Sequence, residues 1–178
     1  MIIDRNIILK MTTMQIAKMI KNGDISCYQI VKIFISQIKN YNYYLNAMAY
    51  NCFNDALNIA KYYDKKYMIY KKNGKINELP KYFGVPIVIK ESFEIPNKPH
   101  TFGFLHRKNI KGKKINPLCG KLIKQGMIII AAGNLAEGCS WIESINKIYG
   151  TTNNPYDIKR TAGGSSGGTA VLVTICGS

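Results

Sequence analysis

The chain of 178 residues is long enough to bury a core of its own, and 47% of its residues are hydrophobic against 20% charged. This balance excludes an intrinsically disordered protein, and no stretch approaches the ~20 consecutive apolar residues of a membrane-spanning helix. The formal net charge of +15 is spread over the whole chain. Because no aromatic platform or known nucleic-acid-binding pattern accompanies the lysines, we expect no nucleic-acid partner; weak attraction to an anionic membrane fits the charge better.

The first 64 residues are predicted to be mostly helical. Thr12 or Thr13 can cap a helix that ends near Gly23. Ser26 can cap a second helix, in which apolar residues recur every three or four positions. A third helical stretch is predicted over about residues 53–63. These helices are interpreted as structural support.

A different pattern follows the helices. Residues 64–82 are rich in lysine and aperiodic, so they are predicted to form a surface connection. The run Gly84–Lys90 is continuously apolar up to its last residue, which is typical of a strand buried on both faces. A helix is predicted over Asn116–Lys124, with proline at its first position, and a second buried strand over 127–131. The order strand, helix, strand predicts a right-handed crossover and an α/β fold.

The cysteines give no sign of a disulfide framework or a metal centre. All five, at positions 27, 52, 119, 139 and 176, are scattered without a C-x-x-C pair, and the chain has only two histidines. An odd, unspaced set of cysteines argues against both disulfides and a zinc site. We therefore expect no metal and no cofactor, and an intracellular location, cytoplasmic or at the periphery of a membrane.

A glycine–serine segment near the end of the sequence admits two interpretations. Residues 163–168 read GGSSGG and lead directly into the apolar run 169–175. The composition alone fits a flexible linker, and the G-x-x-x-x-G-K-[ST] pattern of a phosphate-binding loop is absent. Glycines also allow a ligand to approach the backbone, so Ser165 and Ser166 could present hydroxyl groups beside free N–H groups. Composition alone does not choose between linker and site.

Two longer strings, in a fixed order, distinguish these interpretations. GVPIVIKE at residues 84–91, followed by NNPYD at 153–157 and then GGSSGG, resembles the amidase-signature family. Within it, the sequence is most similar to the fatty-acid amide hydrolases of the type 2 branch, from about Met11 onward. The resemblance implies the N-terminal part of the amidase-signature fold: α/β, with a mixed central sheet covered by helices and incomplete at the C-terminus.

The resemblance also implies how the chain is organised and what it does. It implies one partial amidase domain over 1–178, with N-terminal helices in 1–64 and the start of the sheet core in 84–178. The expected function is hydrolysis of carboxylic amides, in particular fatty-acid amides. The expected partner is a small lipid-like amide substrate, with membrane association and a homodimer as further expectations. The alternative is a catalytically inactive fragment with a binding function or none.

By position, the resemblance implies a Ser–cis-Ser–Lys mechanism in which Lys90 is the base and Ser165 is the bridging serine. A lysine accepts a proton only when its amine is neutral, and burial at the end of an apolar strand favours the neutral form. From the residues alone, Lys90 could equally be an exposed strand terminus paired with Glu91. Ser165 could equally be a turn serine bonded to the local backbone.

Three residues between the two motifs remain open in the sequence. Cys139 lies near the substrate in the family's pattern, so the resemblance implies that Cys139 and Ser165 bind substrate; a small residue in the core is the alternative for Cys139. Glu137 has no assigned role, and Trp141 is predicted to pack in the core.

The family's nucleophilic serine lies in a second segment resembling G-[ST]-D-x-G-G-S, which these 178 residues do not contain. Ser178 lacks that context and is not matched to the nucleophile. The same segment supplies the oxyanion-hole N–H groups in the family, and loss of one such donor typically costs about 2.7–4 kcal/mol. We therefore expect the chain alone to be catalytically inert, and an unfinished sheet to leave it poorly stable.

Overall fold

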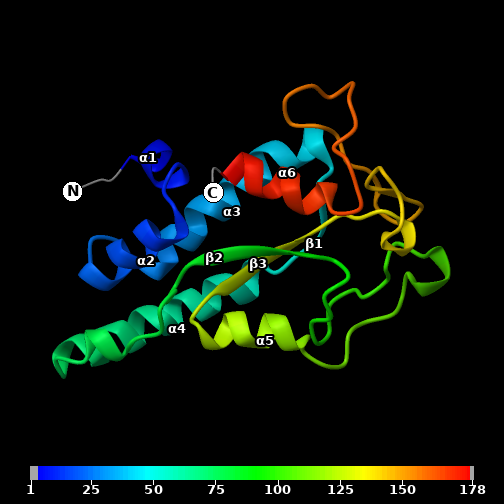
Figure 1. The fold of residues 1–178 in the computed structure, drawn as a ribbon. Helices are drawn as coiled ribbons and strands as arrows, with labels where there is room; N and C mark the ends of the chain where they lie inside the picture. The colour runs from blue at the N-terminus through cyan, green and yellow to red at the C-terminus, as the bar shows by residue number, and fades with distance from the viewer. Residues whose placement is uncertain (1–3, 177–178) are drawn as a thin grey trace.

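The computed structural model describes residues 4–176, and side chains up to residue 175, so that Ser178 and the side chain of Cys176 lie outside the described part. Three helices come first, helices and strands then alternate as far as β3, and a short hairpin and a last helix follow (Figure 1). In order they are α1 (Arg5–Leu9), α2 (Thr13–Asn22), α3 (Cys27–Leu45), β1 (Met48–Asn51), α4 (Phe53–Lys72), β2 (Pro86–Lys90), α5 (Pro117–Lys124), β3 (Ile128–Gly133), β4 (Ile145–Asn146), β5 (Gly150–Thr151) and α6 (Gly167–Cys176).

The predicted caps of the first two long helices are present. Thr12 accepts a hydrogen bond from the Gln15 backbone N–H, and the Gln15 side chain accepts one from the Thr12 N–H in return. Ser26 forms the same reciprocal pair with Gln29 at the start of α3. Each pair satisfies backbone N–H donors that a helix N-terminus leaves without a partner. Because the paired residues are only three positions apart, the first residues of both helices can be predicted from the sequence. Gly23 ends α2 with a φ of 82°, as predicted for a glycine C-cap.

Helix α4 is longer than predicted. It continues to Lys72, so the interpretation of residues 64–82 as a surface connection was wrong for its first part. Three tyrosines, Tyr63, Tyr67 and Tyr70, pack partly against the core at the spacing of one helix face. Their rings supply the apolar stripe that aliphatic residues supply in α3. Of the lysines between them, Lys65 is exposed, and Lys66 places its Nζ 5.4 Å from the centre of the Tyr70 ring.

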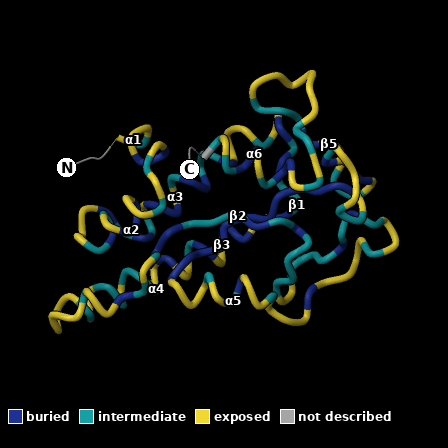
Figure 2. The backbone as a smooth tube through the Cα atoms, viewed as in Figure 1, coloured by how far each residue is buried: buried dark blue, intermediate teal, exposed yellow. Residues whose placement is uncertain are grey.

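The main sheet is mixed, as predicted. Its strand order is β1-β3-β2, with β3 antiparallel to β1 and parallel to β2. The strand β1 was not predicted and comes from the segment 1–64. All six residues of β3 are buried, whereas most of β2 is only half-buried (Figure 2). The predicted burial of the Gly84–Lys90 strand on both faces was therefore too strong, because β2 is an edge strand in the part of the chain described here.

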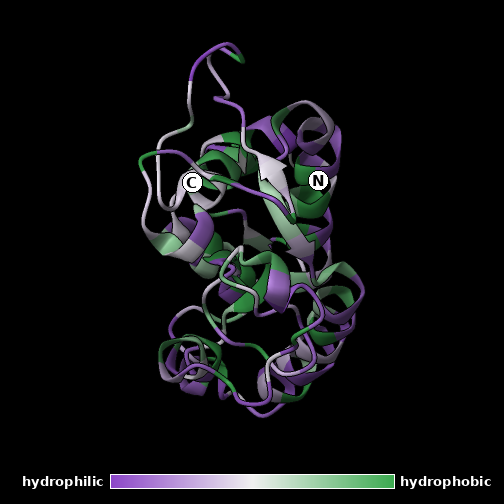
Figure 3. Cartoon of the chain, turned by 90° about the vertical axis from the view of Figure 1, so that its right-hand side faces the viewer, coloured by the Kyte–Doolittle hydropathy of each residue, from purple (hydrophilic) through white to green (hydrophobic). Residues whose placement is uncertain are grey.

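Helices cover both faces of the sheet, and α3 and α6 lie above the strands in Figure 1 while α5 lies below them. Ile128 and Ile130 of β3 join the larger hydrophobic cluster with residues of α2, α3, α4 and α6. Ile129 faces the other way and joins Ile89 of β2 and Cys119 of α5. The helices carry both hydrophobic and hydrophilic residues in Figure 3, as expected of elements with one buried side.

Candidate active site

The glycine–serine segment lies where α6 begins, packed against the end of β3. A Cβ atom on Gly133 would lie 2.3 Å from the Thr169 backbone nitrogen, and one on Gly168 would lie 2.2 Å from that of Asn134. Side chains are therefore excluded from this contact, and glycine lets the two backbones approach. The segment 163–168 is an integral part of the packed fold and not a flexible linker.

This packing brings together the two residues that the sequence analysis selected as catalytic. Lys90 is the last residue of β2, and its Nζ donates a hydrogen bond to Ser165 Oγ at 2.7 Å. Both residues are half-buried, and the Gly164–Ser165 peptide bond is cis. None of the ion pairs among residues 4–175 includes Lys90 or Glu91. The amine of Lys90 thus contacts a hydroxyl group instead of the neighbouring carboxylate.

The backbone around Ser165 is held by a residue that the sequence did not single out. Ser144 is buried, and its Oγ accepts a hydrogen bond from the Gly167 N–H at 2.6 Å and donates one to the Gly163 carbonyl at 2.9 Å. On the other side, the Ala136 N–H donates to the Ser165 carbonyl at 3.2 Å. A lone serine between motifs carries no sequence signal for this function, because its partners are about 20 residues away.

Two buried asparagines connect the end of β3 to the β4–β5 hairpin. Asn146 Nδ2 donates to Asn134 Oδ1 at 2.8 Å and to the Leu135 carbonyl at 2.9 Å. Asn134 Nδ2 in turn donates to the Gly150 carbonyl and to Thr152 Oγ1, both at 3.0 Å. Buried amides need such partners, and here they fix the chain after β3 against the β4–β5 hairpin.

A buried carboxylate lies directly beside the lysine. Glu91 is fully buried and accepts hydrogen bonds from the N–H groups of Thr101 and Phe102, from the Thr101 hydroxyl and from the Tyr149 hydroxyl. Burial and, to a smaller extent, the neighbouring Glu91 carboxylate together raise the pKa of Tyr149 to about 12, against the opposing effect of the hydrogen bond with the Thr101 hydroxyl. No local sequence pattern reveals these partners, because Thr101 and Tyr149 lie 10 and 58 residues from Glu91.

The loop after β3 contains the remaining candidate residues. Cys139 is half-buried with a φ of 60°, in the same loop as Ala136, and it makes no described contact with Lys90 or Ser165. Trp141 is 60% exposed, so its predicted packing in the core was wrong. Its carbonyl oxygen would lie 2.4 Å from a Cβ on Gly164, so the backbone of Trp141, and not its ring, is the packed part. Glu137 and Trp141 line a cavity of about 380 Å³ beside the β4–β5 hairpin, to which Cys139 does not contribute.

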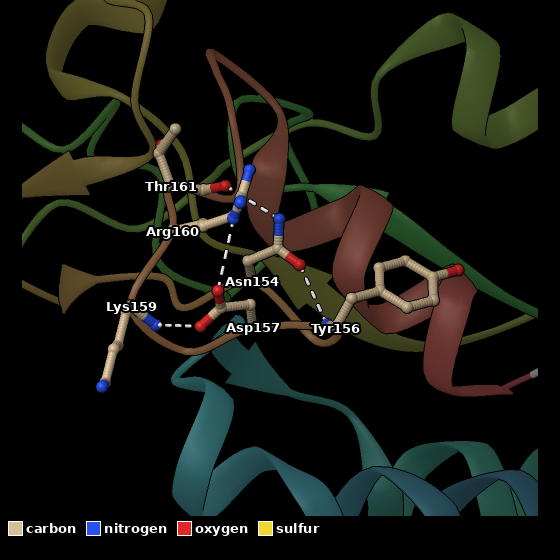
Figure 4. A network of polar contacts seen from close by, with 6 residues as sticks. All are labelled: Asn154, Tyr156, Asp157, Lys159, Arg160 and Thr161. Carbon is tan, nitrogen blue, oxygen red and sulfur yellow. Dashed lines mark hydrogen bonds and ion pairs between the residues drawn. The ribbon is translucent and has the colours of Figure 1, made fainter.

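The NNPYD string forms a loop that is stabilised mainly by its own polar groups (Figure 4). Asn154 Oδ1 accepts from the Tyr156 N–H, and Asn154 Nδ2 donates to the Thr161 carbonyl. Asp157 accepts from the Lys159 N–H and from Arg160 Nε at 3.3 Å. These contacts turn the chain back toward Gly163, where the glycine–serine segment begins.

Within residues 4–175, no group of three or more histidine, cysteine, aspartate or glutamate side chains could hold a metal ion. Among the helices described, none combines the length and the apolarity that crossing a membrane requires.

Comparison with known proteins places this geometry in a family. The sequence model of the Amidase family matches residues 29–178. The zebrafish (Danio rerio) fatty-acid amide hydrolase 2-A is 36% identical over 166 residues, which are 92% of this chain and 31% of that protein. The human (Homo sapiens) fatty-acid amide hydrolase 2 is 34% identical, over 90% of this chain and 30% of that protein. The chain therefore belongs to the Amidase family, and it spans about 30% of the length of these curated relatives.

Solved structures agree on the fold. A fatty acid amide hydrolase matches with a TM-score of 0.86 and 22% identity, over 100% of this chain and 30% of that one. A bacterial aryl acylamidase of the amidase-signature family matches with a TM-score of 0.83 and 24% identity, over 92% of this chain and 33% of that one. The expectation of a mixed α/β fold of amidase-signature type is thereby confirmed.

Proposed function

We propose that this chain supplies the lysine and the bridging serine of a serine hydrolase that cleaves carboxylic amides. Lys90 is the proposed base and Ser165 the proposed proton relay. The observation that carries the proposal is the 2.7 Å contact between Lys90 Nζ and Ser165 Oγ, made in a chain that belongs to the Amidase family. Base and hydroxyl at this distance are within reach for proton transfer.

The proposed mechanism moves two protons along a line of three groups. In this step the Ser165 hydroxyl donates to the Lys90 amine, the reverse of the direction of the hydrogen bond described above. The neutral Lys90 amine takes the proton of the Ser165 hydroxyl, while the Ser165 oxygen takes the proton of a second serine. The oxygen of that second serine forms a bond to the amide carbon, and the C–N bond breaks as the proton returns through Ser165 to the leaving nitrogen. Water then hydrolyses the acyl-serine by the same relay. The attacking serine is proposed to lie outside the 178 residues, in a second glycine–serine segment, so that the chain alone does not hydrolyse amides.

The proposed substrates are fatty-acid amides. This choice is supported by the two fatty-acid amide hydrolase 2 proteins to which the chain is 36% and 34% identical. Cys139 is proposed to contact the substrate beside Ser165, because it lies in the loop that bonds the Ser165 carbonyl. The proposal has four further parts. The chain forms a single partial amidase domain and associates with an anionic membrane surface inside the cell. It forms a homodimer and has no nucleic-acid partner.

A chimeric enzyme tests the proposal. The 178 residues replace the matching part of the zebrafish fatty-acid amide hydrolase 2-A, and hydrolysis of a long-chain primary amide is measured. We expect activity that falls about 10²–10⁴-fold in Lys90→Ala, because a positioned base contributes about that factor. Lys65→Ala, which removes an exposed lysine of α4, serves as the control and keeps the activity. Activity that survives Lys90→Ala would refute the assigned roles. A folded chimera with no activity would support the alternative, an inactive fragment.

A further inference from the structure

Glu91 is a buried carboxylate for which the proposed mechanism has no use. It is 0% exposed, and it takes part in none of the ion pairs found among residues 4–175. A buried charge is costly unless hydrogen bonds compensate for its lost hydration. Here four donors do so: Thr101 N at 2.6 Å, Thr101 Oγ1 at 2.8 Å, Phe102 N at 3.0 Å and Tyr149 Oη at 3.2 Å. The carboxylate thus anchors the turn that contains Thr101 and Phe102.

From this turn, hydrogen bonds continue to Ser165. The N–H of Phe102 donates to Glu91, while its carbonyl accepts from the Gly138 N–H at 2.8 Å. Gly138 lies two residues after Ala136, whose N–H donates to the Ser165 carbonyl at 3.2 Å. The segment 136–138 therefore bridges the anchored turn and the backbone of the proposed relay serine.

Lys90 and Glu91, which are neighbours in the chain at the end of β2, reach Ser165 by two routes. Lys90, the last residue of β2, bonds the Ser165 hydroxyl directly. Glu91, the first residue of the following turn, reaches the Ser165 carbonyl through Phe102 and the segment 136–138. The two routes close a ring of contacts that fixes the hydroxyl and the carbonyl of Ser165 relative to the end of β2.

We propose that Glu91 is a positioning residue, whose carboxylate holds Phe102 and the segment 136–138 in the place that keeps Ser165 against Lys90. The catalytic importance of holding Ser165 against Lys90 rests on the proposed function. The contacts of Glu91 themselves are present in the chain whether or not it hydrolyses amides. A carboxylate with a purely structural role would stabilise the turn at Thr101 and Phe102 and leave the contact between Lys90 and Ser165 unaffected.

A neighbouring glutamate provides the matched control. Glu94 lies three residues further along the same segment, and its Oε1 accepts from the backbone N–H groups of Lys113 at 2.6 Å and Lys114 at 3.1 Å. These contacts attach a different loop and do not lead to Ser165. Glu94→Gln thus removes the same charge and weakens comparable backbone contacts, without touching the ring that contains Glu91.

Two measurements on the 178-residue chain test the role of Glu91. The first is amide hydrogen exchange by nuclear magnetic resonance at Phe102, Gly138 and Ala136. The second is the rate at which acetic anhydride acetylates Lys90 relative to exposed Lys65, mapped by mass spectrometry over a range of pH. In Glu91→Gln we expect exchange at Ala136 to become about tenfold faster or more, since hydrogen bonds to an ionised group are the strong ones. We also expect faster relative acetylation of Lys90, because its amine loses the contact with Ser165. Glu94→Gln should match the wild type.

Several outcomes would overturn the proposal. A folded Glu91→Gln chain with faster exchange at Phe102 but unchanged Ala136 exchange and Lys90 acetylation would show a structural role only. The same changes in Glu94→Gln would show a general effect of lost charge. If Glu91→Gln does not fold, Tyr149→Phe removes one of the four contacts, and the same pattern is expected with a smaller size; no change at Ala136 and Lys90 would again refute the role.

Neither hydrogen exchange nor acetylation requires the chain to hydrolyse a substrate. An inactive chimera that keeps this coupling therefore refutes the proposed function alone, and an active chimera without it refutes the role of Glu91 alone.

Discussion

Tyr149 links one partly buried residue to the stability of the chain at alkaline pH. Burial, with the Glu91 carboxylate nearby, raises its pKa from the ordinary 10.0 to about 12. The folded chain therefore holds this proton at pH values where the unfolded chain has released it. The contribution to stability is complete below pH 10 and is lost as the pH rises from about 10 through about 12.

We accordingly expect the free energy of unfolding to fall more steeply between pH 10 and pH 12 in the wild type than in Tyr149→Phe. Urea denaturation at a series of pH values measures both slopes. Tyr43→Phe is the control, because Tyr43 is 87% exposed and its loss leaves the wild-type slope. Parallel curves for the wild type and Tyr149→Phe would contradict the expectation.

Some residues of the candidate site can be recognised from a short stretch of sequence, and others cannot. Lys90 and Ser165 each stand inside a recognisable string, so their selection needed no structure, and the structure brings them to 2.7 Å from each other. Glu91 stands in the same string, yet its partners Thr101 and Tyr149 do not, and the sequence suggested only an ion pair with Lys90. A buried network that joins distant segments is defined by the packing of the folded chain, which short-range patterns do not encode.

At the scale of elements, the junction of β3 and α6 depends on glycine. We expect Gly168→Ala to destabilise the chain by about 1–3 kcal/mol or more, because overpacking of a tight contact forces the backbones apart. The new Cβ would lie 2.2 Å from the Asn134 nitrogen. Denaturant unfolding measures the loss, and acetylation of Lys90 should rise as α6 and Ser165 move away.

Gly120→Ala is the matched control for this substitution. Gly120 lies inside α5, where a Cβ would meet nothing closer than 3.9 Å. Alanine is favoured over glycine within helices, so this variant should be more stable by about 0.5–1 kcal/mol. Equal destabilisation by both substitutions would show that the close approach of α6 to β3 is unimportant.

The start of α3 depends on a side chain from α4. Asp64 accepts hydrogen bonds from the backbone N–H groups of Cys27 at 2.7 Å and Tyr28 at 3.1 Å, where a helix N-terminus also favours negative charge. We expect Asp64→Ala to lower the free energy of unfolding by about 1–3 kcal/mol, because both N–H groups lose their partner. Asp24→Ala, at an exposed position, should change it by less than about 0.5 kcal/mol. The interpretation fails if the two variants are equally stable in urea.

The elements that the sequence predicts well are those with local signals. The starts of α2 and α3 follow from Thr12 and Ser26, whose capping partners lie three residues away. The four-residue strand β1 has no such signal, since it is a strand only because it pairs with β3. The second half of α4 was missed because tyrosines, not aliphatic residues, form its buried stripe.

For the molecule as a whole, charge repulsion should limit stability. The sequence has 25 basic residues against 10 acidic ones. Several of the acidic side chains, including Asp64, Glu91 and Glu94, bond to backbone N–H groups. Consequently few carboxylates are left to neutralise lysines, and the ion pairs among residues 4–175 are three, each with an exposed partner.

Salt should therefore stabilise the chain. The screening length falls from about 30 Å at 0.01 M salt to about 8 Å at 0.15 M, which removes most of the repulsion between distant lysines. We expect the midpoint of thermal unfolding to rise over this range of sodium chloride. The rise should be smaller in the double variant Lys65→Glu and Lys72→Glu, which exchanges two positive for two negative charges on the exposed side of α4. A midpoint that stays constant or falls in the wild type would show that packing, and not the charge of +15, sets the stability of this fold.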